Sequence, residues 1–430
     1  MKHLTEDFKT APYWWEATPR PDLEMPELPK NIDVAIIGSG YTGLCAALQT
    51  ARGGRSTVVF DAKDVGWGCS TRNGGQISTS VKPDLVHLAR KHGPNAAFAI
   101  LKEGYNSLAW IKDFVTEERI DCAFDVPGRF HAAHSPAQYE ILARKIANQP
   151  KGLEEPAHIV PCAEQYSELG TDAYFGGAVL ESHASLDPAG YHQGLLERVL
   201  AADATVIPNC AVTTLSRAGN GFDVTTVRGV VRAREVLVAT NGYTGRLTPW
   251  LRRRVIPIGS YMIATEPLET SVMNELMPRN RVVSDTRKVV YYYRPSPDRS
   301  RIVFGGRVTS GETDPRHSAE LLRCDLVGVF PELAKVRISH SWLGYVAYTF
   351  DELAHVGKQD GIYYAMGYSG SGVSMASYLG TRTGQKILGL KEGSTGFDDV
   401  SFQTRPFYTG MPWFLAASVA YYRWRDGTGG

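Results

Sequence analysis

The sequence predicts an α/β protein in which a domain built on a parallel sheet is interleaved with a second, α+β domain built on an antiparallel sheet. Three observations lead to this prediction. Residues 34–37 form an apolar run that leads into a glycine-rich turn and a helical pattern. The same succession of strand, glycine turn and helix returns at residues 361–388, near the other end of the chain. Between the two, strand-like segments mix aromatic, aliphatic and charged residues, as half-buried antiparallel strands do.

The first glycine turn has the features of a dinucleotide site. Four consecutive apolar residues at 34–37 are typical of a buried parallel strand. Gly38, Gly40 and Gly43 follow at the spacing of a tight turn, a close approach to a pyrophosphate and a close helix–strand contact. The helix expected at residues 44–51 presents its N-terminus, with about half a positive charge, to the same turn.

A second strand and an acidic residue complete this β-α-β unit at residues 31–61. Residues 57–60 are apolar, and Asp61 follows them at the position where a carboxylate accepts hydrogen bonds from a ribose hydroxyl. A glycine motif by itself is weak evidence, but here the strand, turn, helix and carboxylate occur together. The sequence therefore predicts a dinucleotide site. The alternative, an ordinary glycine-rich turn, treats the spacing of Asp61 as coincidence.

Apolar residues at intervals of three or four predict the helices, and runs rich in β-branched and aromatic residues predict the strands. The expected helices span residues 84–118, 136–148, 187–200 and 373–388. The expected strands span residues 124–133, 177–181, 205–207, 211–215, 222–227, 230–238, 256–266, 288–295 and 301–307. Residues 1–30, with five prolines and an aromatic cluster at 13–15, predict an extended arm that is anchored on the body by its rings.

The composition is that of an ordinary globular protein, since 43% of the 430 residues are hydrophobic and 21% are charged. The net charge of +1 argues against a nucleic-acid or anionic-membrane partner. Six scattered cysteines without a C-x-x-C motif indicate reduced thiols. Without a signal peptide or an integral membrane segment, we expect a cytoplasmic protein. The tail at 421–424 is expected to pack on the protein itself, with peripheral membrane contact as the alternative.

A flavin explains why two glycine turns lie so far apart in the sequence. A nicotinamide enzyme normally completes its nucleotide-binding fold early in the chain, whereas this chain returns to a glycine-rich helix start at residues 367–372. A long cofactor held at both ends accounts for that return. The first helix would neutralise the pyrophosphate, and the second would point its positive end at the pyrimidine side of a flavin ring.

Three further segments point to a known family. Residues 66–76, 236–242 and 367–372, together with the first glycine turn, resemble the D-amino-acid-oxidase-like FAD-dependent amine oxidoreductases. Within that family the chain is most similar to bacterial γ-glutamylputrescine oxidases and the related L-pipecolate oxidases. The resemblance covers nearly the full length. It implies a fold of the glutathione-reductase-2 type, in which a Rossmann-like FAD-binding domain is interleaved with an antiparallel-sheet substrate domain.

The resemblance also implies how the chain divides. Residues 1–30 form the arm, and residues 396–430 form a C-terminal tail. The FAD-binding domain is discontinuous and comprises residues 31–85, 155–258 and 340–395. The substrate domain comprises residues 86–154 and 259–339.

Carried over motif by motif, the resemblance implies a role for each part of the FAD site. The first glycines line the pyrophosphate turn, Asp61 binds the adenosine ribose, and the backbone of Val212 meets the adenine. Residues 72–76 run along the ribityl chain and flavin ring, and residues 370–372 face a flavin carbonyl. The implied FAD contacts are Gly38, Ser39, Gly40, Tyr41, Thr42, Gly43, Asp61, Ala62, Lys63, Ser70, Thr71, Arg72, Asn73, Gly74, Gly75, Gln76, Val212, Asn241, Gly242, Gly344, Gly367, Tyr368, Ser369, Gly370, Ser371 and Gly372.

The chain departs from the family pattern near the flavin. Ser371 stands where many relatives carry a histidine. Sarcosine oxidases link their flavin covalently through a cysteine in the segment equivalent to residues 344–349, but no cysteine follows Cys324 here. We therefore predict a non-covalent FAD. The lysine that sarcosine oxidases use toward oxygen aligns roughly with Val303, which leaves oxygen as an acceptor without that support.

The expected cation for a substrate carboxylate is also missing. Amino-acid oxidases of this family carry an arginine in the 344–349 segment, where this chain offers Val346 or Ala347. A simple α-amino acid is therefore a weaker candidate substrate, unless Arg294 or Arg307 supplies the cation.

Hydride transfer from an amine carbon to a flavin needs a close ring, aromatic walls and dry surroundings. In the strand at 288–295, alternation places Tyr291 and Tyr293 on one face, and Tyr292 and Arg294 on the other. The candidate substrate-site residues are Tyr261, Tyr293, Arg307, Trp342 and Tyr345. The alternative for each tyrosine is a place in the core, and for the arginine it is an exposed charge.

These features predict an FAD-dependent amine oxidase that oxidises a C–N bond to an imine, with oxygen as acceptor and hydrogen peroxide as product. The first choice of substrate is a γ-glutamyl-polyamine or a similar small-molecule amine, followed by a cyclic secondary amino acid such as L-pipecolate. A dehydrogenase with a quinone or protein acceptor would also fit these motifs, and so would a non-catalytic flavin-binding protein. His131 and His134 lie three apart without a third ligand nearby, so no metal site is predicted.

Overall fold

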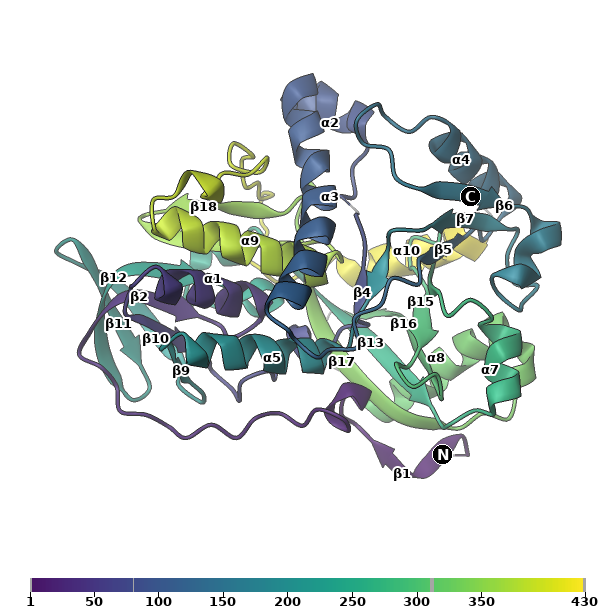
Figure 1. Ribbon diagram of the computed structural model, residues 1–430, viewed down its shortest axis with the longest axis horizontal. Helices are drawn as coiled ribbons and strands as arrows, with labels where there is room; N and C mark the ends of the chain where they lie inside the picture. Colours follow the sequence, from purple (N-terminus) through teal and green to yellow (C-terminus); the bar gives the residue numbers. More distant parts are fainter. Residues whose placement is uncertain (1, 80, 310–312, 428–430) are drawn as a thin grey trace.

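Two large sheets lie side by side in the computed structural model, and helices cover them (Figure 1). The structure describes residues 2–79, 81–309 and 313–427, apart from the side chain of Arg307. One sheet is parallel at its centre and the other is mainly antiparallel. The predicted α/β class, with two interleaved sheets, is therefore confirmed.

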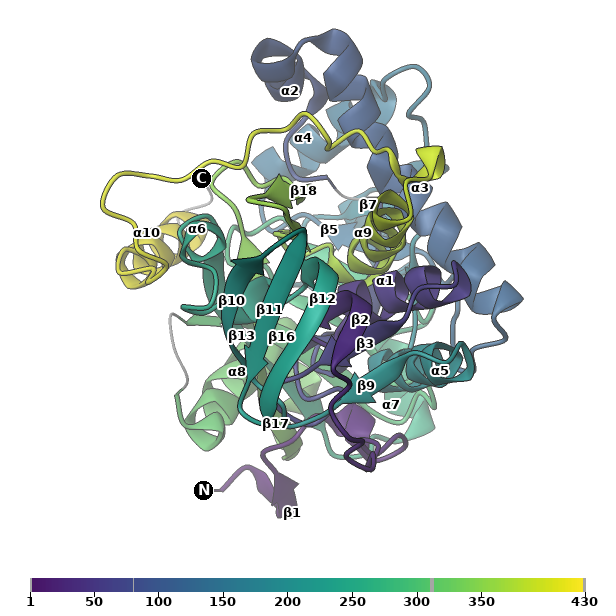
Figure 2. The ribbon, with the colours of Figure 1, turned by 90° about the vertical axis from the view of Figure 1, so that its left-hand side faces the viewer.

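The first sheet contains the β-α-β unit that the sequence predicted. Its eight strands are β2 (Asn31–Ile37), β3 (Thr57–Phe60), β9 (Thr205–Ile207), β10 (Val212–Ala218), β11 (Gly221–Thr226), β12 (Gly229–Val238), β18 (His355–Gln359) and β19 (Ile362–Met366). Strands β9, β3, β2, β12 and β19 run parallel, whereas β10, β11 and β12 form an antiparallel meander. Figure 2 shows these strands, from β10 to β9, across the front of the molecule.

Strand β2 contributes side chains to a hydrophobic core on each face of the sheet, which explains why residues 34–37 are all apolar. Val34 and Ile36 pack with helices α1 (Tyr41–Arg52) and α9 (Gly372–Ile387), whereas Ala35 and Ile37 pack with the meander. Successive side chains of a strand point to opposite faces, so a strand that is covered on both faces must be apolar throughout.

The second sheet has nine strands. In sheet order they are β1 (Leu4–Lys9), β17 (Ile338–Tyr348), β13 (Ile256–Thr265), β16 (Ile302–Thr309), β15 (Tyr292–Pro295), β14 (Val282–Asp285), β5 (Arg129–Ala132), β7 (Gly177–Leu180) and β6 (Ala157–Val160). The first of these was not expected, because the N-terminal arm begins as a strand that pairs with β17. A small pair, β4 (Gln76–Ile77) and β8 (Ala184–Ser185), completes the sheets.

The remaining helices are α2 (Leu85–His92), α3 (Pro94–Glu117), α4 (Pro136–Ala147), α5 (Pro188–Ala201), α6 (Pro249–Arg252), α7 (Thr270–Leu276), α8 (Pro315–Val329) and α10 (Leu415–Gly427). The single helix expected at 84–118 is divided into α2 and α3. Gly93 separates them with a φ of +83°, and Pro94, which has no N–H group to donate, begins the second helix.

Two expected strands are shorter than the sequence indicated. The strand predicted at 124–133 begins only at Arg129, because Ala123 and Gly128 adopt positive φ angles of 47° and 74°. The strand predicted at 288–295 begins at Tyr292. The carboxylates of Asp285 and Asp426 accept hydrogen bonds from four N–H groups of residues 287–291. These N–H groups are therefore not available for pairing with a neighbouring strand.

Sheet membership crosses the predicted domain borders. Strands β6 and β7 lie in the predicted FAD-binding segment 155–258, and β17 opens the segment 340–395, yet all three belong to the nine-stranded sheet. Helix α3 lies in the predicted substrate segment 86–154, but its apolar side packs on α9 and shares the core of β2 and α1. Burial of an apolar face decides where an element belongs, and we propose that the domains be divided accordingly.

Candidate active site

A cavity of about 1730 Å³ lies where the two sheets meet. Its walls include the turns that follow β2, β3 and β12, the start of α9, and residues of β5, β13, β14 and β15 from the second sheet. Ligands of open parallel sheets bind at the carboxyl ends of the strands, where these turns lie. Pockets for drug-sized molecules measure about 300–1,000 Å³, so this cavity has room for a large cofactor and a second molecule.

The first glycine turn brings backbone close to the cavity. Gly38 has a φ of +106°, which favours glycine. A Cβ at Gly43 would lie 1.9 Å from the carbonyl oxygen of Gly38, so the turn and helix α1 are in direct backbone contact. Gly40 precedes the helix and has no side chain to cap it, and the hydroxyl of Ser70 accepts a hydrogen bond from the N–H of Tyr41 at 3.0 Å. The N-terminus of α1 therefore faces the cavity with its positive end, as a pyrophosphate site requires.

Asp61 is held at the edge of the cavity by the same turn. Its Oδ2 accepts hydrogen bonds from the N–H and the hydroxyl of Ser39, at 2.9 and 2.6 Å, and its Oδ1 accepts one from the N–H of Lys63. Behind the turn, Nε2 of the buried His192 lies 2.8 Å from the carbonyl oxygen of Ser39. Burial lowers the pKa of His192, so this histidine is a neutral donor that supports the turn. His192 was not among the residues expected at the site from the sequence.

The second glycine turn opens into the same cavity. Gly370 has a φ of +96°, and the side chain of Ser371 does not cap the helix α9 that begins after it. The turn is held from outside, because Oδ1 of Asn241 accepts a hydrogen bond from the N–H of Gly367 at 2.9 Å.

Small residues bring the two helices together. A Cβ at Gly380 of α9 would lie 2.4 Å from the carbonyl oxygen of Thr42 of α1. The hydroxyl of Thr42 also lies 2.6 Å from the hydroxyl of Tyr368. Because α1 and α9 pack closely, two positive helix ends converge on one elongated space. The residues present therefore fit a cofactor that carries a pyrophosphate at one end and a ring that gains negative charge at the other.

The N-terminal arm fixes the glycine-rich loop at residues 66–76. The guanidinium of Arg72 lies between the rings of Trp15 and Trp67, at 4.8 Å from the centre of each. The indole N–H groups of Trp14 and Trp342 donate to the carbonyl oxygens of Asn73 and Arg72, both at 2.9 Å. Rings from both ends of the sequence thus hold this wall of the cavity.

Most of the residues expected to contact the cofactor line the cavity. They are Gly38, Ser39, Gly40, Tyr41, Thr42, Asp61, Ala62, Lys63, Ser70, Arg72, Asn73, Gly74, Gln76, Val212, Asn241, Gly344, Tyr368, Gly370, Ser371 and Gly372. Six others lie outside the lining of the described cavity, namely Gly43, Thr71, Gly75, Gly242, Gly367 and Ser369. Several of these six shape the wall from behind. For example, a Cβ at Gly242 would lie 2.7 Å from the carbonyl oxygen of Tyr345.

Four of the five candidate substrate residues lie outside the lining of the described cavity. Tyr261, Tyr293 and Trp342 are fully buried and do not line the cavity in the part of the chain that the structure describes. The ring of Tyr293 stacks on Phe304 in the core of the second sheet. Tyr345 packs edge-on against Tyr243 and is also outside the lining. Arg307 lies on β16, and its side chain is outside the described residues.

Tyr292, and not the predicted Tyr293, lines the cavity. Its ring faces the cavity, and its hydroxyl lies 2.8 Å from that of Ser260. A Cβ at Gly305 would lie 2.3 Å from the ring of Tyr292, so this glycine makes room for the ring. Alternation along the strand identified the two faces, but only the packing of the sheet shows which face is open.

Arg294 is buried and does not reach the cavity among the described residues. Its guanidinium donates to the carbonyl oxygens of Leu186, Gly75 and Pro295, at 2.9, 3.4 and 3.0 Å. This arginine therefore supports the loop at residues 66–76 and is unavailable as a substrate anchor. Val346 and Ala347 line the cavity as apolar wall.

A polar chamber forms the part of the cavity next to β5 and β14. Its side chains are Lys82, Arg129, His131, Glu155, His183 and Ser284. The guanidinium of Arg129 donates to Nδ1 of His183 at 3.1 Å and to the hydroxyl of Ser284 at 2.8 Å. Of these six residues only His131 stood out in the sequence, through its spacing from His134. In the described part of the chain, no group of three His, Cys, Asp or Glu residues is placed to hold a metal ion.

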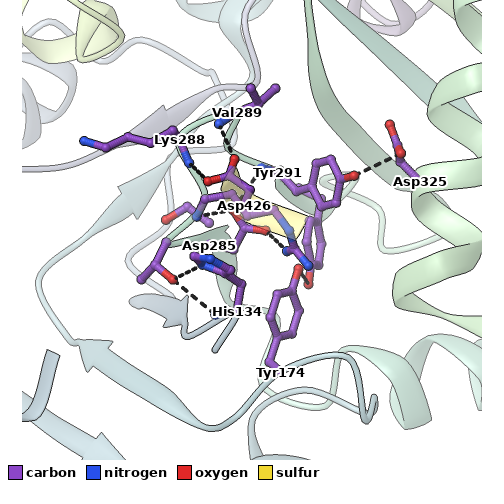
Figure 3. Close-up of polar contacts among 12 residues, drawn as sticks. His134, Tyr174, Asp285, Lys288, Val289, Tyr291, Asp325 and Asp426 are labelled. Carbon is purple, nitrogen blue, oxygen red and sulfur yellow. Dashed lines mark hydrogen bonds and ion pairs between the residues drawn. The ribbon is translucent and has the colours of Figure 1, made fainter. Parts of the chain in front are cut away.

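Two carboxylates hold the loop at residues 286–291, which borders the cavity with Lys288 and Val290 (Figure 3). From inside, Asp285 accepts the N–H groups of Arg287 and Tyr291. From outside, Asp426 of α10 accepts the N–H groups of Lys288 and Val289, at 3.0 and 3.1 Å. Asp426 therefore anchors the C-terminal helix to the protein and secures one wall of the site. The rings of Tyr421, Tyr422 and Trp424, which were expected to pack on the protein, are exposed.

Replacing Asp426 by alanine is expected to loosen this wall. The substitution removes two hydrogen bonds to a charged acceptor, each of which contributes about 1.5–3 kcal/mol. Hydrogen exchange at the amides of Lys288 and Val289 should become about tenfold faster or more. Asp399→Ala, which removes an exposed carboxylate from the same C-terminal region, provides the control. Unchanged exchange in the Asp426 variant would show that α10 does not secure the loop.

Among the described residues, no helix is both long enough and apolar enough to cross a bilayer. All six cysteines are free. Cys69 lines the cavity, and burial raises the pKa of its thiol to about 11.

Comparison with known proteins identifies the cofactor that this cavity holds. Residues 33–385 match the DAO family, described as FAD dependent oxidoreductase. The chain is 30% identical to γ-glutamylputrescine oxidoreductase of Escherichia coli (strain K12), over 92% of this chain and 93% of that protein. It is 31% identical to the probable oxidoreductase OrdL of Rhizobium meliloti (strain 1021), over 96% and 97%.

Solved structures of low sequence identity share the fold. Glycine oxidase from Geobacillus kaustophilus superposes with a TM-score of 0.74 at 19% identity, over 88% of this chain and 99% of that chain. Iminodiacetate oxidase from Chelativorans sp. BNC1 superposes with a TM-score of 0.69 at 17% identity, over 86% and 98%. The family is FAD-dependent, and the glycine turns and helix starts described above line a cavity with room for such a cofactor.

Proposed function

The chain belongs to the DAO family of FAD-dependent oxidoreductases and acts on amines or amino acids, and we propose that its substrate is a γ-glutamyl-polyamine or a similar long amine, with oxygen as acceptor. The observation that carries this proposal is the size and division of the cavity. The turns that would hold FAD line one part, and a polar chamber extends beyond it, next to β5 and β14. The name of the Escherichia coli relative, γ-glutamylputrescine oxidoreductase, agrees with a substrate of that length.

The residues of the first and second glycine turns would hold FAD at its two ends. The N-terminus of α1 and the turn at Gly38 would bind the pyrophosphate, and Asp61 would accept from the ribose. The N-terminus of α9 would face the flavin ring, where it favours negative charge. When bound, FAD supplies the acceptor for a hydride from the amine carbon. We propose that it is held without a covalent bond.

The walls of the substrate space suit a neutral amine close to the flavin. Tyr292, Tyr348, Val346 and Ala347 line this part of the cavity. Burial raises the pKa of Tyr348 to about 12, so its hydroxyl keeps its proton and can orient an amine by hydrogen bonding. Apolar and aromatic walls exclude water and favour the uncharged amine that can lose a hydride.

The proposed oxidation conserves atoms and electrons. The amine CH–NH₂ group loses a hydride and a proton and becomes a C=NH imine, which water hydrolyses to an aldehyde and ammonia. The two electrons, with two protons, reduce oxygen to hydrogen peroxide. The walls described above position the amine and keep bulk water away from the reacting carbon.

Anaerobic reduction of the bound flavin tests the proposal. We expect γ-glutamylputrescine to bleach the visible absorption of the purified holoenzyme, and we expect L-pipecolate, L-proline and sarcosine to do so more slowly. Admitting air should restore the absorption and yield one peroxide per flavin. γ-Glutamylbutylamine, which lacks the terminal amine, is the matched control and should bind without bleaching.

Different results would contradict particular parts of the proposal. Bleaching by L-pipecolate alone would identify a cyclic amino acid as the substrate. Slow recovery in air, with fast recovery on addition of a quinone, would identify a dehydrogenase. Absence of bleaching by every amine would show that the proposed reaction is wrong and leave the FAD site unaffected.

A further inference from the structure

Two cations face the polar chamber of the cavity. Arg129 lies at the start of β5, and Lys82 lies in the segment that follows β4. Both side chains line the cavity, where Arg129 is half-buried and Lys82 is exposed. The two charges lie close enough for Arg129 to lower the pKa of Lys82, in addition to the larger effect of burial.

The surroundings of Arg129 orient its guanidinium without neutralising it. Nε donates to Nδ1 of His183, so the proton of this imidazole is on Nε2, which lies 3.3 Å from a carboxylate oxygen of Glu155. Glu155 is therefore separated from Arg129 by the whole histidine ring. Among the described residues, no carboxylate forms an ion pair with Arg129 or Lys82.

Apart from the carboxylate of Glu155, which lies beside His183, the other polar groups of the chamber are neutral or paired. Burial and the charge of Arg129 lower the pKa of His131 to about 3, so this ring is uncharged at neutral pH. Its Nδ1 lies 3.0 Å from the hydroxyl of Ser284, which also accepts from Arg129. Asp285 faces the chamber too, but its carboxylate pairs with Arg287. The chamber therefore carries an excess of positive charge.

An enclosed guanidinium without a direct carboxylate partner is unfavourable unless a ligand supplies one. Burial lowers the pKa of Arg129 to about 10, so the group stays charged at neutral pH. Its fork of N–H donors matches the two oxygens of a carboxylate, and Lys82 adds a point charge. The missing partner is thus an anion with carboxylate geometry.

We infer that Arg129 and Lys82 bind a carboxylate at the far end of the amine substrate. This inference rests on the proposed function, and it specifies the substrate class as a long amine that ends in a carboxylate. Ser284 of β14 pairs with Tyr292 of β15 on one side and with His131 of β5 on the other. Strands β5 and β15 are therefore two strand spacings apart, about 10 Å. The guanidinium of Arg129 reaches from β5 to the hydroxyl of Ser284 on β14, the strand between them, and faces the cavity there.

Binding of an unreactive carboxylate tests this inference without turnover. Calorimetric titration of the holoenzyme with γ-glutamylbutylamine gives its Kd. We expect Arg129→Gln to weaken binding by about 10- to 100-fold, the usual effect of losing hydrogen bonds to a charged group. Lys82→Gln should weaken binding as well, and this side chain makes no hydrogen bond with the described residues that folding could require. Arg129→Lys, which keeps the charge, should recover part of the affinity.

The control is Arg90→Gln, which removes one positive charge from an exposed position outside the cavity. Its Kd should equal that of the unaltered protein. With turnover, Arg129→Gln should raise the KM for γ-glutamylputrescine, and it should not lower kcat/KM for putrescine, which has no carboxylate and whose second ammonium group is repelled by the arginine. Near-native circular dichroism and flavin content would show that each variant is folded.

The outcomes separate this inference from the proposed function. Equal affinity of the unaltered protein, Arg129→Gln and Lys82→Gln for the probe would overturn the inference. Equal losses for putrescine and γ-glutamylputrescine would do the same. Weaker binding in these variants, in a protein whose flavin no amine reduces, would support the carboxylate site and show that the proposed reaction is wrong.

Discussion

Gly43→Ala is expected to yield a protein that folds but retains little FAD. The new Cβ would lie 1.9 Å from the carbonyl oxygen of Gly38, and both groups belong to rigid backbone. No side-chain rotation relieves this contact, so either the pyrophosphate turn or the start of α1 must move. Overpacking typically costs about 1–3 kcal/mol. Because each 1.4 kcal/mol is tenfold in affinity, we expect FAD binding to weaken by about 100-fold.

Flavin content per purified protein, and the Kd for FAD from titration of the apoprotein, measure this effect. Gly328→Ala is the matched control, because a Cβ there meets no atom within 4 Å and the residue lies inside helix α8. This control should keep its FAD, and alanine should stabilise the helix slightly. Normal flavin content in the Gly43 variant would show that the close contact at this turn is not required for FAD binding.

Trp342→Ala is expected to destabilise the protein severely. The indole is completely buried between Trp14 and the second sheet, and its N–H donates to the carbonyl oxygen of Arg72 at 2.9 Å. Truncating a buried tryptophan to alanine usually costs about 3–5 kcal/mol, and the orphaned carbonyl adds to this loss. The midpoint of denaturant unfolding should fall accordingly.

Trp424→Ala provides the comparison, since this indole in α10 is 65% exposed. The same truncation there should leave the unfolding midpoint almost unchanged, because surface substitutions usually have small effects. A Trp342 variant of normal stability that fails to reduce its flavin would contradict the structural role. That result would restore this tryptophan as a residue of the substrate site.

The glycine turn and the cofactor could be predicted because their determinants are local. Gly38, Gly40 and Gly43 specify a turn over a few residues, and Asp61 follows the next strand at a spacing that only the β-α-β unit explains. The second glycine turn at residues 367–372 carries the same kind of information. The family and the cofactor inferred from these motifs are confirmed by the match of residues 33–385 to the DAO family.

The substrate end could not be predicted in the same way. Tyr292 and Tyr293 are adjacent and chemically identical, and the sequence could assign them to opposite faces but not decide which face borders a cavity. Arg294 and Arg129 have the same charge but different surroundings. Arg294 donates to carbonyl oxygens of residues 75, 186 and 295, whereas Arg129 faces the cavity.

The sequence by itself determined the fold class, the cofactor and the class of reaction, because glycine spacing and apolar periodicity act over short stretches of backbone. The tertiary structure decided which side chains line the cavity beyond the glycine turns. Lys82, Arg129 and Tyr292 come from three separate segments, and only the pairing of β5, β14 and β15 brings the last two to the same cavity. Contacts between distant segments depend on how whole sheets pack, and no local pattern records that packing.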